Sequence, residues 1–332
     1  MISNWSFRRM PMLLLAGLIC SGAVEAAQPE QRTFLFNYDT TVTGLQPGAS
    51  ARVWLPVPPN NEVQRVDLVA QSLPAPAALG TDPATGNRML AFEAPADADG
   101  EIPLHLTYKV TRHEIGELPP AKDPDSAADL KANRLIPIGG APQKLLLGQT
   151  LPTDPLQRGR ALYDVVFNNM TYRKDQPGWG RGDATWACDS HFGNCTDFHS
   201  LFMSLARTSG LPAKFEIGFG VPEKHGTDNV AGYHCWALFH PEGHGWIPVD
   251  ISEASKHPEK REYFFGHLCA NRVAFSTGRD LTLVPKQSGE PLNYFVYPYV
   301  EVDGKPLPAD KLKMAFSYQD LDNPATQPAV VN

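Results

Sequence analysis

The chain has 332 residues and a formal net charge of −7, from 29 basic and 36 acidic residues. This acidic balance argues against a nucleic-acid-binding protein, which would present a basic face. The 31 prolines and 27 glycines favour a loop-rich chain with many short strands.

The N-terminal segment, residues 1–26, is typical of a cleavable signal peptide. Arg8 and Arg9 precede an apolar run from Met10 to Ile19, and Val24-Glu25-Ala26 fits a small-x-Ala cleavage pattern. The apolar run is too short to span a bilayer comfortably, and no later run approaches that length. We therefore expect a soluble mature protein that is periplasmic or secreted and has no stable membrane insertion. About 300 residues remain, enough for two domains with sizeable cores.

Residues 31–112 alternate apolar and polar side chains in short runs that turn residues separate. We expect strands in RTFLFNYDTTVT, ARVWLPVP, VQRVDLVAQSL, NRMLAFEA and IPLHLTYKVTR. Short alternating strands at roughly ten-residue spacing are typical of a small β sandwich. Because no reactive cluster lies here, we interpret this N-terminal β-rich domain as a packing or recognition module. A connector at residues 113–150 follows it.

Two helices are predicted after the connector. The first begins after Asp154, an N-cap residue followed by Pro155. The second begins at Cys195, where Asn194 is a good N-cap and Asp197 completes a capping box. Apolar residues then follow at helical spacing and form one buried stripe: Phe198, Leu201, Phe202, Leu205 and Ala206.

The position of Cys195 favours a reactive thiol. Helical geometry turns its side chain toward the element on which the helix packs. The thiol also lies at the positive end of the helix dipole, which lowers a thiol pKa. Such a thiol still needs a base before it can act as a nucleophile.

The segment GYHCWALFHPEGHGWIPVDI, residues 232–251, predicts a β-hairpin with the loop Pro241-Glu242-Gly243. Pairing centred on this loop puts Leu238 opposite Trp246. The same register puts His234 opposite Asp250, and directly opposed residues have Cβ atoms about 5 Å apart. An imidazole and a carboxylate would then lie side by side.

This pair supplies the base that Cys195 lacks. The carboxylate of Asp250 would orient the imidazole of His234, which would take the thiol proton. The neighbours of His234 on the strand, Tyr233 and Cys235, would point to the opposite face and pack in the core.

Two other roles for Cys195 stay open at this point. One is a structural zinc site, because four potential ligands have suitable spacing: Cys188, His191, Cys195 and His199. The other is a disulfide, with Cys188 or Cys235 as the partner.

The segments GNCTDFHSLFMSLARTSGLPAKFEIGF, GYHCWALF and GWIPVDISEA together resemble the three successive motifs of the transglutaminase-like superfamily. The resemblance covers about residues 150–255. It implies an α+β fold with a papain-like core, in which a catalytic helix packs on an antiparallel sheet. The later segments resemble strands that follow the catalytic aspartate in bacterial exported members, so we expect the catalytic domain to span residues 151–320.

The resemblance also implies the chemistry. Cys195 is the expected nucleophile, His234 the base and Asp250 the residue that orients the base. The expected reaction is acyl transfer from a peptide or glutamine amide through a thioester, by a peptidase, an amidase or a transglutaminase. The partners would be a peptide or protein substrate and, for cross-linking, an amine acceptor. No cofactor is implied, and a catalytically inactive binding scaffold stays open as the alternative.

The residues around the triad receive expected roles as well. The backbone N–H of Cys195 is the first expected oxyanion donor. Trp179 and Trp186 are candidates for the second donor or for lining the cleft. Four residues are expected to support the triad from behind: Asn194, Asp197, His199 and Trp236.

Overall fold

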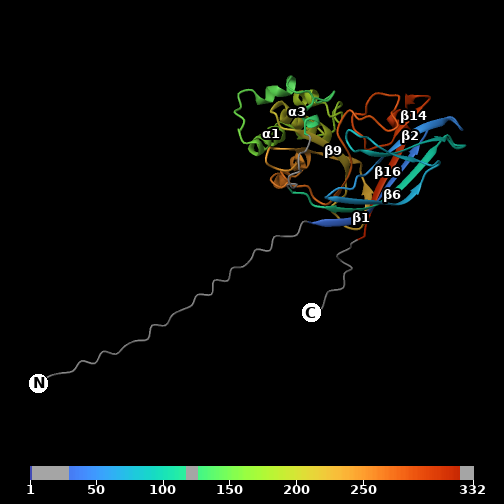
Figure 1. Cartoon of the computed structure of the whole chain (residues 1–332), viewed down its shortest axis with the longest axis horizontal. Coiled ribbons are helices and arrows are strands. Elements are labelled where there is room, and N and C mark those ends of the chain that lie inside the picture. Colours follow the sequence, from blue (N-terminus) through green and yellow to red (C-terminus); the bar gives the residue numbers. More distant parts are fainter. Residues whose placement is uncertain (2–29, 117–125, 322–332) are drawn as a thin grey trace.

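The computed structural model describes residue 1 and residues 30–116 and 126–321. The expected cleavage site at residues 24–26 lies outside these ranges. Figure 1 shows helices α1 and α3 gathered at one end of the molecule and two large sheets at the other, with β9 between them. In the described ranges, no helix is long and apolar enough to cross a membrane.

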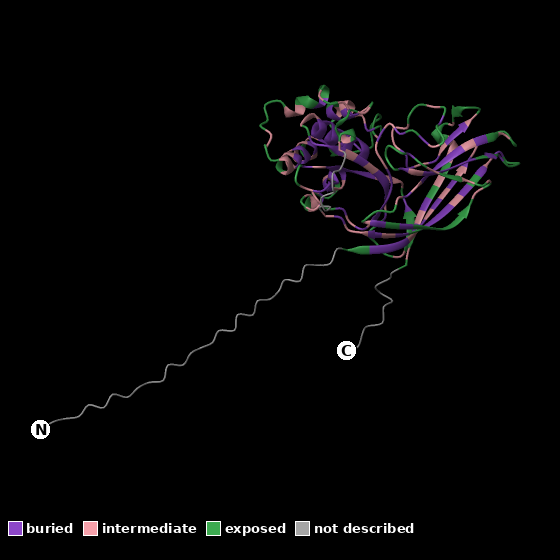
Figure 2. Cartoon of the chain, viewed as in Figure 1, coloured by how far each residue is buried: buried purple, intermediate pink, exposed green. Residues whose placement is uncertain are grey.

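Two five-stranded antiparallel sheets form the strand-rich end. The first has the order β10 (Thr227–Val230), β16 (Leu312–Asp320), β1 (Gln31–Val42), β6 (Ile102–His113) and β3 (Gln64–Ser72). The second has the order β15 (Lys305–Pro306), β14 (Tyr299–Val302), β2 (Ser50–Val57), β5 (Arg88–Pro95) and β4 (Ala78–Thr81). The five strands expected between residues 31 and 112 are confirmed. Both sheets bury one face in a common apolar core (Figure 2).

The C-terminal strands belong to these sheets and do not extend the catalytic domain. β16 pairs with β1 from Phe34–Asp320 to Val42–Leu312. β14 pairs with β2 in the other sheet. The expected assignment of all residues up to 320 to the catalytic domain is therefore wrong at its C-terminal end. Local sequence patterns do not show with which distant strand a C-terminal strand will pair, because strand pairing depends on long-range packing.

A third, four-stranded antiparallel sheet carries the motifs. Its order is β12 (Ile247–Val249), β11 (Tyr233–Phe239), β9 (Ala213–Gly220) and β13 (Arg272–Thr277). Four α-helices accompany it: α1 (Pro155–Asn169), α2 (Ala184–Ser190), α3 (Cys195–Thr208) and α4 (Ile251–Lys256). Short 3-10 helices are η1 (Ala128–Leu130), η2 (Ala141–Leu146), η3 (Pro258–Lys260) and η4 (Ala309–Lys311). Helix α3 packs on β11 and β9.

Aromatic side chains join the third sheet to the sandwich. Phe36 of β1 lies 5.0 Å from Phe219 of β9 and 5.8 Å from Phe275 of β13, between ring centroids. Phe316 of β16 lies 4.5 Å from Phe219. The catalytic sheet therefore rests on the sandwich through a shared core, which fixes the base of the site.

Helix α3 begins as predicted but is buried more completely. The capping box between Asn194 and Asp197 is present. The apolar stripe predicted one buried face, whereas every residue from Cys195 to Arg207 is buried. The reason is that α1, α2, α4 and η2 cover the sides of α3 that do not face the sheet. Polar residues of α3 are thus also interior, where they need partners.

Candidate active site

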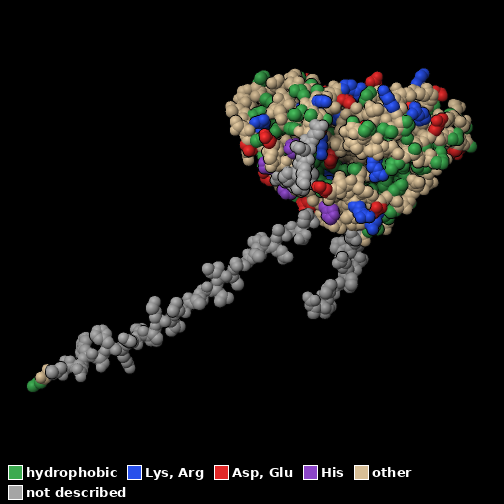
Figure 3. All heavy atoms as spheres, viewed as in Figure 1, with side chains coloured by type: hydrophobic (Ala, Val, Ile, Leu, Met, Phe, Trp, Pro, Cys, Tyr) green, Lys and Arg blue, Asp and Glu red, His purple; other side chains and the backbone are tan. Residues whose placement is uncertain are grey.

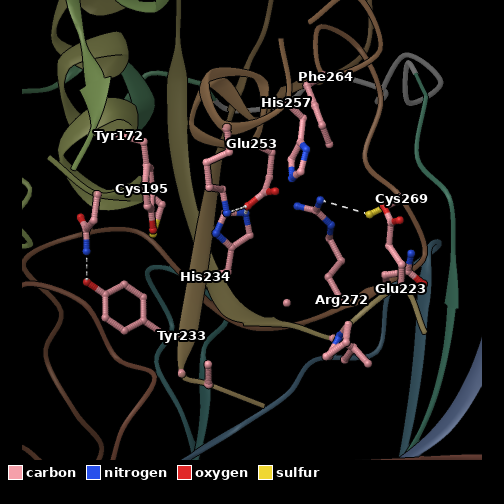
Figure 4. A pocket seen from close by; sticks show the side chains of 18 of the residues that line it. Tyr172, Cys195, Glu223, Tyr233, His234, Glu253, His257, Phe264, Cys269 and Arg272 are labelled. Atoms are coloured by element: carbon pink, nitrogen blue, oxygen red, sulfur yellow. Dashed lines mark hydrogen bonds and ion pairs between the residues drawn. The ribbon is translucent and has the colours of Figure 1, made fainter. Parts of the chain in front are cut away.

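The three predicted triad side chains meet at the start of α3. Nε2 of His234 lies 2.7 Å from Oδ2 of Asp250. The imidazole also lies near the thiol of Cys195, and each group shifts the pKa of the other toward its charged form. Because Nε2 faces Asp250, the ring nitrogen that faces the thiol is Nδ1. Figure 4 shows Cys195 and His234 pointing into one cleft from α3 and β11.

The hairpin register that led to this pairing is wrong. β11 and β12 pair Leu238 with Pro248, two residues away from the predicted partner, Trp246. Phe239 pairs with Ile247, so residues 240–246 form the loop, and within it the N–H of His244 donates to the carbonyl of Pro241 at 3.1 Å. His234 and Asp250 still meet, because Asp250 leaves the sheet to become the N-cap of α4.

Asp250 is fully buried and receives several donors. Its carboxylate accepts hydrogen bonds from Arg272 Nη1 at 3.1 Å, from Ser252 Oγ at 3.1 Å and from the N–H of Glu253 at 3.1 Å. Burial opposes its charge, but the charges of His234 and Arg272 hold the pKa of Asp250 well below its usual range. Arg272 was not predicted from the sequence, because it comes from β13 and no spacing rule links it to the motifs.

The surroundings of the thiol and the imidazole favour the charged form of each group. Burial opposes ionisation of Cys195, but hydrogen bonds from Cys235 and His234 lower the pKa of its thiol to about 5. Burial disfavours the charged form of His234 too, but the charge and hydrogen bond of Asp250, with the hydrogen bond of Cys195, raise its pKa to about 10. Between these values the site holds a thiolate beside an imidazolium. Such a pair can attack a carbonyl carbon and protonate a leaving group.

Asp197 holds the loop at residues 178–182 against the start of α3. Its carboxylate accepts the N–H of Asn194 at 3.0 Å, of Gly180 at 2.7 Å and of Gly182 at 2.9 Å. Asn194 caps the helix by accepting the N–H of Thr196 at 3.0 Å. Its amide donates to the hydroxyl of Tyr233 at 2.8 Å. These two residues therefore shape the wall around Cys195 without offering a reacting group.

His199 and Trp236 contact neighbours of the triad. Nε2 of His199 accepts the N–H of Ile251 at 3.1 Å, and burial lowers the pKa of this histidine to about 4. The neutral ring must carry its proton on Nδ1, which faces the sulfur of Cys235 at 3.5 Å. The ring of Trp236 lies 6.0 Å from that of His234 and 4.8 Å from the guanidinium of Arg272. It therefore packs behind the base.

The two candidate tryptophans lie in different places. Trp186 packs edge-on against Phe192, with ring centroids 5.2 Å apart, and is not among the described residues that line the cleft. Trp179 does line the cleft, where the amino group of Lys174 lies 5.5 Å from its ring centroid. Of the two candidates, Trp179 therefore lies at the cleft, whereas Trp186 is not among the described residues that line it. A residue type in a loop does not reveal the direction of its side chain.

Tyr172 is a cleft residue that the sequence did not reveal. β7 (Thr171–Tyr172) and β8 (Phe192–Gly193) form a short parallel pair in which Tyr172 lies opposite Gly193. This pairing carries the phenol to the nucleophile, and Figure 4 shows Tyr172 next to Cys195. Burial and the charge of Cys195 raise the pKa of Tyr172, so its hydroxyl stays protonated and can donate.

The cleft has a volume of about 610 Å³ and runs from Cys195 past His234 to Arg272 and Cys269 (Figure 4). Charges of both signs line it: Lys174, Lys256, Lys260 and Arg272 against Glu223 and Glu253. Two of these lysines form ion pairs with the glutamates, Lys256 with Glu253 and Lys260 with Glu223. The face seen in Figure 3 likewise mixes carboxylates with lysines and arginines.

The structure separates the ligands of the zinc alternative. The sulfur of Cys188 contacts the carbonyl of Ala141 at 3.7 Å, and Nδ1 of His191 lies 2.9 Å from the side-chain oxygen of Asn169. His199 faces β11 instead. Nowhere in the described residues do three His, Cys, Asp or Glu side chains gather to hold a metal ion. The zinc alternative is therefore wrong. The structure also holds no permanent disulfide among the described residues, because the four described cysteines are free thiols.

Comparison with known proteins defines the class. Residues 146–251 match the transglutaminase-like superfamily and form a domain of that superfamily. An uncharacterized protein of Haemophilus influenzae is 30% identical over 335 residues, an alignment that covers 82% of this chain and 86% of that protein. The chain belongs to the same family as this Haemophilus protein.

One solved structure agrees with the predicted α+β fold and its papain-like core. The crystal structure of a "putative cysteine protease" from Cytophaga hutchinsonii has a TM-score of 0.57 and 16% identity, and covers 89% of this chain and 93% of that chain. The periplasmic domain of TgpA from Pseudomonas aeruginosa has a TM-score of 0.36 and 18% identity, and covers 72% of this chain and 92% of that chain. Nothing below rests on the second comparison.

Proposed function

We propose that this protein is a cysteine-dependent enzyme that transfers acyl groups from peptide or glutamine amides through a thioester at Cys195. The observation that carries the proposal is the contact of one imidazole with both partners. His234 lies 2.7 Å from Asp250 through Nε2, and Cys195 is near enough to help raise the pKa of the imidazole against the effect of burial. Cys195 lies at a helix start and lines a cleft, and side-chain packing alone does not account for an unpaired thiol with a lowered pKa at that position.

In the first step, the thiolate of Cys195 attacks the carbonyl carbon of the amide and negative charge develops on the carbonyl oxygen. The N–H of Cys195 is available to this oxygen, because the first N–H groups of a helix have no intrahelical acceptor. We assign the second hydrogen bond to the hydroxyl of Tyr172, in place of a tryptophan. The parallel pairing beside Gly193 and the protonated phenol support this assignment.

The imidazolium of His234 completes the acylation. It gives the proton on Nδ1 to the leaving amine as the carbon–nitrogen bond breaks, and Asp250 holds the ring through Nε2. The thioester then reacts with an incoming nucleophile, whose proton returns to His234. Water as nucleophile gives hydrolysis, and an amine gives a new amide bond.

We propose a peptide or protein as the acyl donor. The mixed charges of the cleft suit a polar chain, and the Cytophaga hutchinsonii protein of the same fold is named for protease activity. On the sequence of residues 1–26, we place the reaction in the periplasm or outside the cell. The rival is an inactive scaffold that keeps the fold.

The decisive test traps the thioester. The protein is incubated with glutaminyl and stem-peptide substrates, with and without monodansylcadaverine as amine, and the peptide that contains Cys195 is weighed by mass spectrometry. We expect an acyl adduct on Cys195 that the Cys195→Ala variant lacks. A shortened or deamidated product indicates water as acceptor, and a dansyl conjugate indicates the amine. An unmodified Cys195 with every substrate, together with slow alkylation at pH 6, would establish the scaffold instead.

A further inference from the structure

The thiol of Cys235 is buried beside the nucleophile, and the proposed reaction does not use it. Along β11, side chains alternate between faces, so Cys235 points away from the side of His234 and toward α3. Cys235 is buried, but the expectation of simple core packing overlooked the residues beside it. The opposite face is the one on which the catalytic helix packs.

Packing places Cys235 beside the start of α3. Burial opposes ionisation of Cys195, but interactions with the side chain and the backbone N–H of Cys235 lower the pKa of its thiol. Nδ1 of His199 lies 3.5 Å from the sulfur of Cys235 on its other side. Cys235 is 0% exposed and Cys195 2% exposed, and only Cys195 of the two lines the cleft.

We propose that Cys195 and Cys235 form a reversible disulfide when a hydroperoxide enters the cleft, so that the second thiol protects the nucleophile from irreversible oxidation. The inference shares the nucleophile with the proposed function but requires no acyl substrate. Access determines the order of events: an oxidant in the cleft meets Cys195 first, and Cys235 reacts from within the protein.

The chemistry proceeds in two steps. The thiolate of Cys195 attacks the O–O bond of the hydroperoxide, an S–O bond forms, and an alcohol leaves with the proton of His234. The sulfur of Cys235 then attacks the sulfenic sulfur, the S–S bond forms, the S–O bond breaks, and hydroxide leaves with the proton of Cys235 as water. Two thiols lose two electrons and one hydroperoxide gains them. Without the second thiol, the sulfenic acid would continue to sulfinic acid, which thiols do not reduce.

The other described thiols provide internal controls. Cys269 lines the same cleft, where the guanidinium of Arg272 donates to its sulfur at 3.4 Å. Cys188 is buried against the carbonyl of Ala141. Neither is among the groups that hydrogen-bond to the sulfur of Cys195. An oxidant that joined thiols by chance exposure would use Cys269 before Cys235.

The test treats the reduced protein with a few equivalents of hydrogen peroxide at pH 7 and maps its peptides without reduction. We expect a crosslinked pair of peptides that contain Cys195 and Cys235. Dithiothreitol should restore rapid iodoacetamide labelling of Cys195. In Cys235→Ala, the same treatment should convert Cys195 to sulfinic acid, and recoverable labelling should fall by roughly tenfold. Cys188→Ala and Cys269→Ala should still form the crosslink.

Three results would each overturn the inference: a crosslink between Cys195 and Cys269, equal sulfinic acid formation in the parent and in Cys235→Ala, or no change at Cys195. The readout is thiol chemistry and does not depend on turnover. A crosslink in a protein that forms no acyl adduct would therefore reject the proposed function and keep this inference. An acyl adduct without a crosslink would do the reverse.

Discussion

Strand β1 and helix α3 are both interior elements, but they are enclosed in different ways. From Phe34 to Val42, β1 alternates buried and half-buried side chains, and the aromatic ones point into the sandwich core. In α3, burial has no such period, and Asp197 and His199 are as buried as Phe198. An element with one covered face thus shows its environment in its sequence, whereas a fully enclosed one does not. The polar residues of α3 are interior because other helices cover the sides of α3 that do not face the sheet, and Asp197 uses its position there to hold the loop beside the nucleophile.

This contrast implies that substitutions in the two regions separate reactivity from stability, and Cys195→Ser gives the largest effect. The hydroxyl of serine is a far weaker nucleophile than the thiolate and cannot form the ion pair. We expect acyl transfer to fall by roughly 10⁴-fold or more, as for the loss of other catalytic nucleophiles. The free energy of unfolding, measured in urea, should change little because the side chains have similar size. A stable, fully active serine variant would contradict the proposed nucleophile.

Leu106→Ala tests the opposite case in the sandwich. Leu106 lies in β6, is 1% exposed and belongs to the core. Removing a buried leucine side chain should lower the free energy of unfolding by about 2–5 kcal/mol. The rate at which iodoacetamide labels Cys195 in the folded protein should stay within about twofold of the rate in the parent. A substitution in the sandwich core acts independently of a distant site with which it shares no contacts. A slow-labelling but folded Leu106→Ala would show that the two regions are coupled.

His234→Ala should change the pH dependence of the thiol. In the parent, labelling of Cys195 should rise as the pH passes through about 5, the pKa that the imidazole helps to lower. Without the imidazolium, the thiolate loses a favourable charge, so the pKa rises and the labelling curve moves to higher pH. At pH 6 we expect labelling to fall by roughly 10²-fold.

The matched control for this substitution is His240→Ala, just after the far end of the strand that carries His234. The ring of His240 packs on Trp246 at 5.3 Å between centroids, away from Cys195. The pH dependence of Cys195 labelling in His240→Ala should coincide with that of the parent. Should both variants label alike, the imidazole of His234 would have no part in activating the thiol.

Asp197→Ala should affect both stability and reactivity, since this residue of α3 organises the loop at residues 178–182. The substitution leaves three buried N–H groups without their acceptor. We expect the free energy of unfolding in urea to fall by about 3 kcal/mol, and labelling of Cys195 to change as the loop loosens. Asp175→Ala is the control, because the side chain of Asp175 is 63% exposed and pairs with Arg173 at the surface. If Asp197→Ala is as stable as Asp175→Ala, the proposed structural role of Asp197 is contradicted.

Local signals in the sequence were sufficient for the start of each major helix. The capping of α1 by Asp154 and the capping box of α3 depend on residues within one turn, so the sequence predicts them directly. The triad was predicted from motif spacing, although the hairpin register behind it was wrong. Capping of α4 by Asp250, rather than strand pairing, brings the carboxylate to His234.

Long-range features of the site could not be predicted in this way. Arg272 reaches Asp250 from β13, and β14 and β16 return to the sandwich from the end of the chain. Each of these contacts joins residues that are far apart in the sequence, and no local periodicity identifies the partner. The same limit explains why two tryptophans were preferred to Tyr172, which only the pairing of β7 with β8 brings to Cys195.

Tyr172→Phe gives the smallest effect and the sharpest test of the cleft wall. The substitution removes one hydroxyl and keeps the ring that packs on Phe198, with centroids 6.2 Å apart. If the hydroxyl stabilises the oxyanion, kcat should fall by roughly 10²-fold with little change in KM, because the hydrogen bond forms only in the transition state. Alkylation of Cys195, which develops no oxyanion, should stay near the parental rate. Tyr263→Phe removes a hydroxyl that donates to Glu114 instead and should leave kcat unchanged. Equal kcat values in both variants would contradict the assignment of Tyr172 and leave Trp179 or a backbone N–H as the second oxyanion donor.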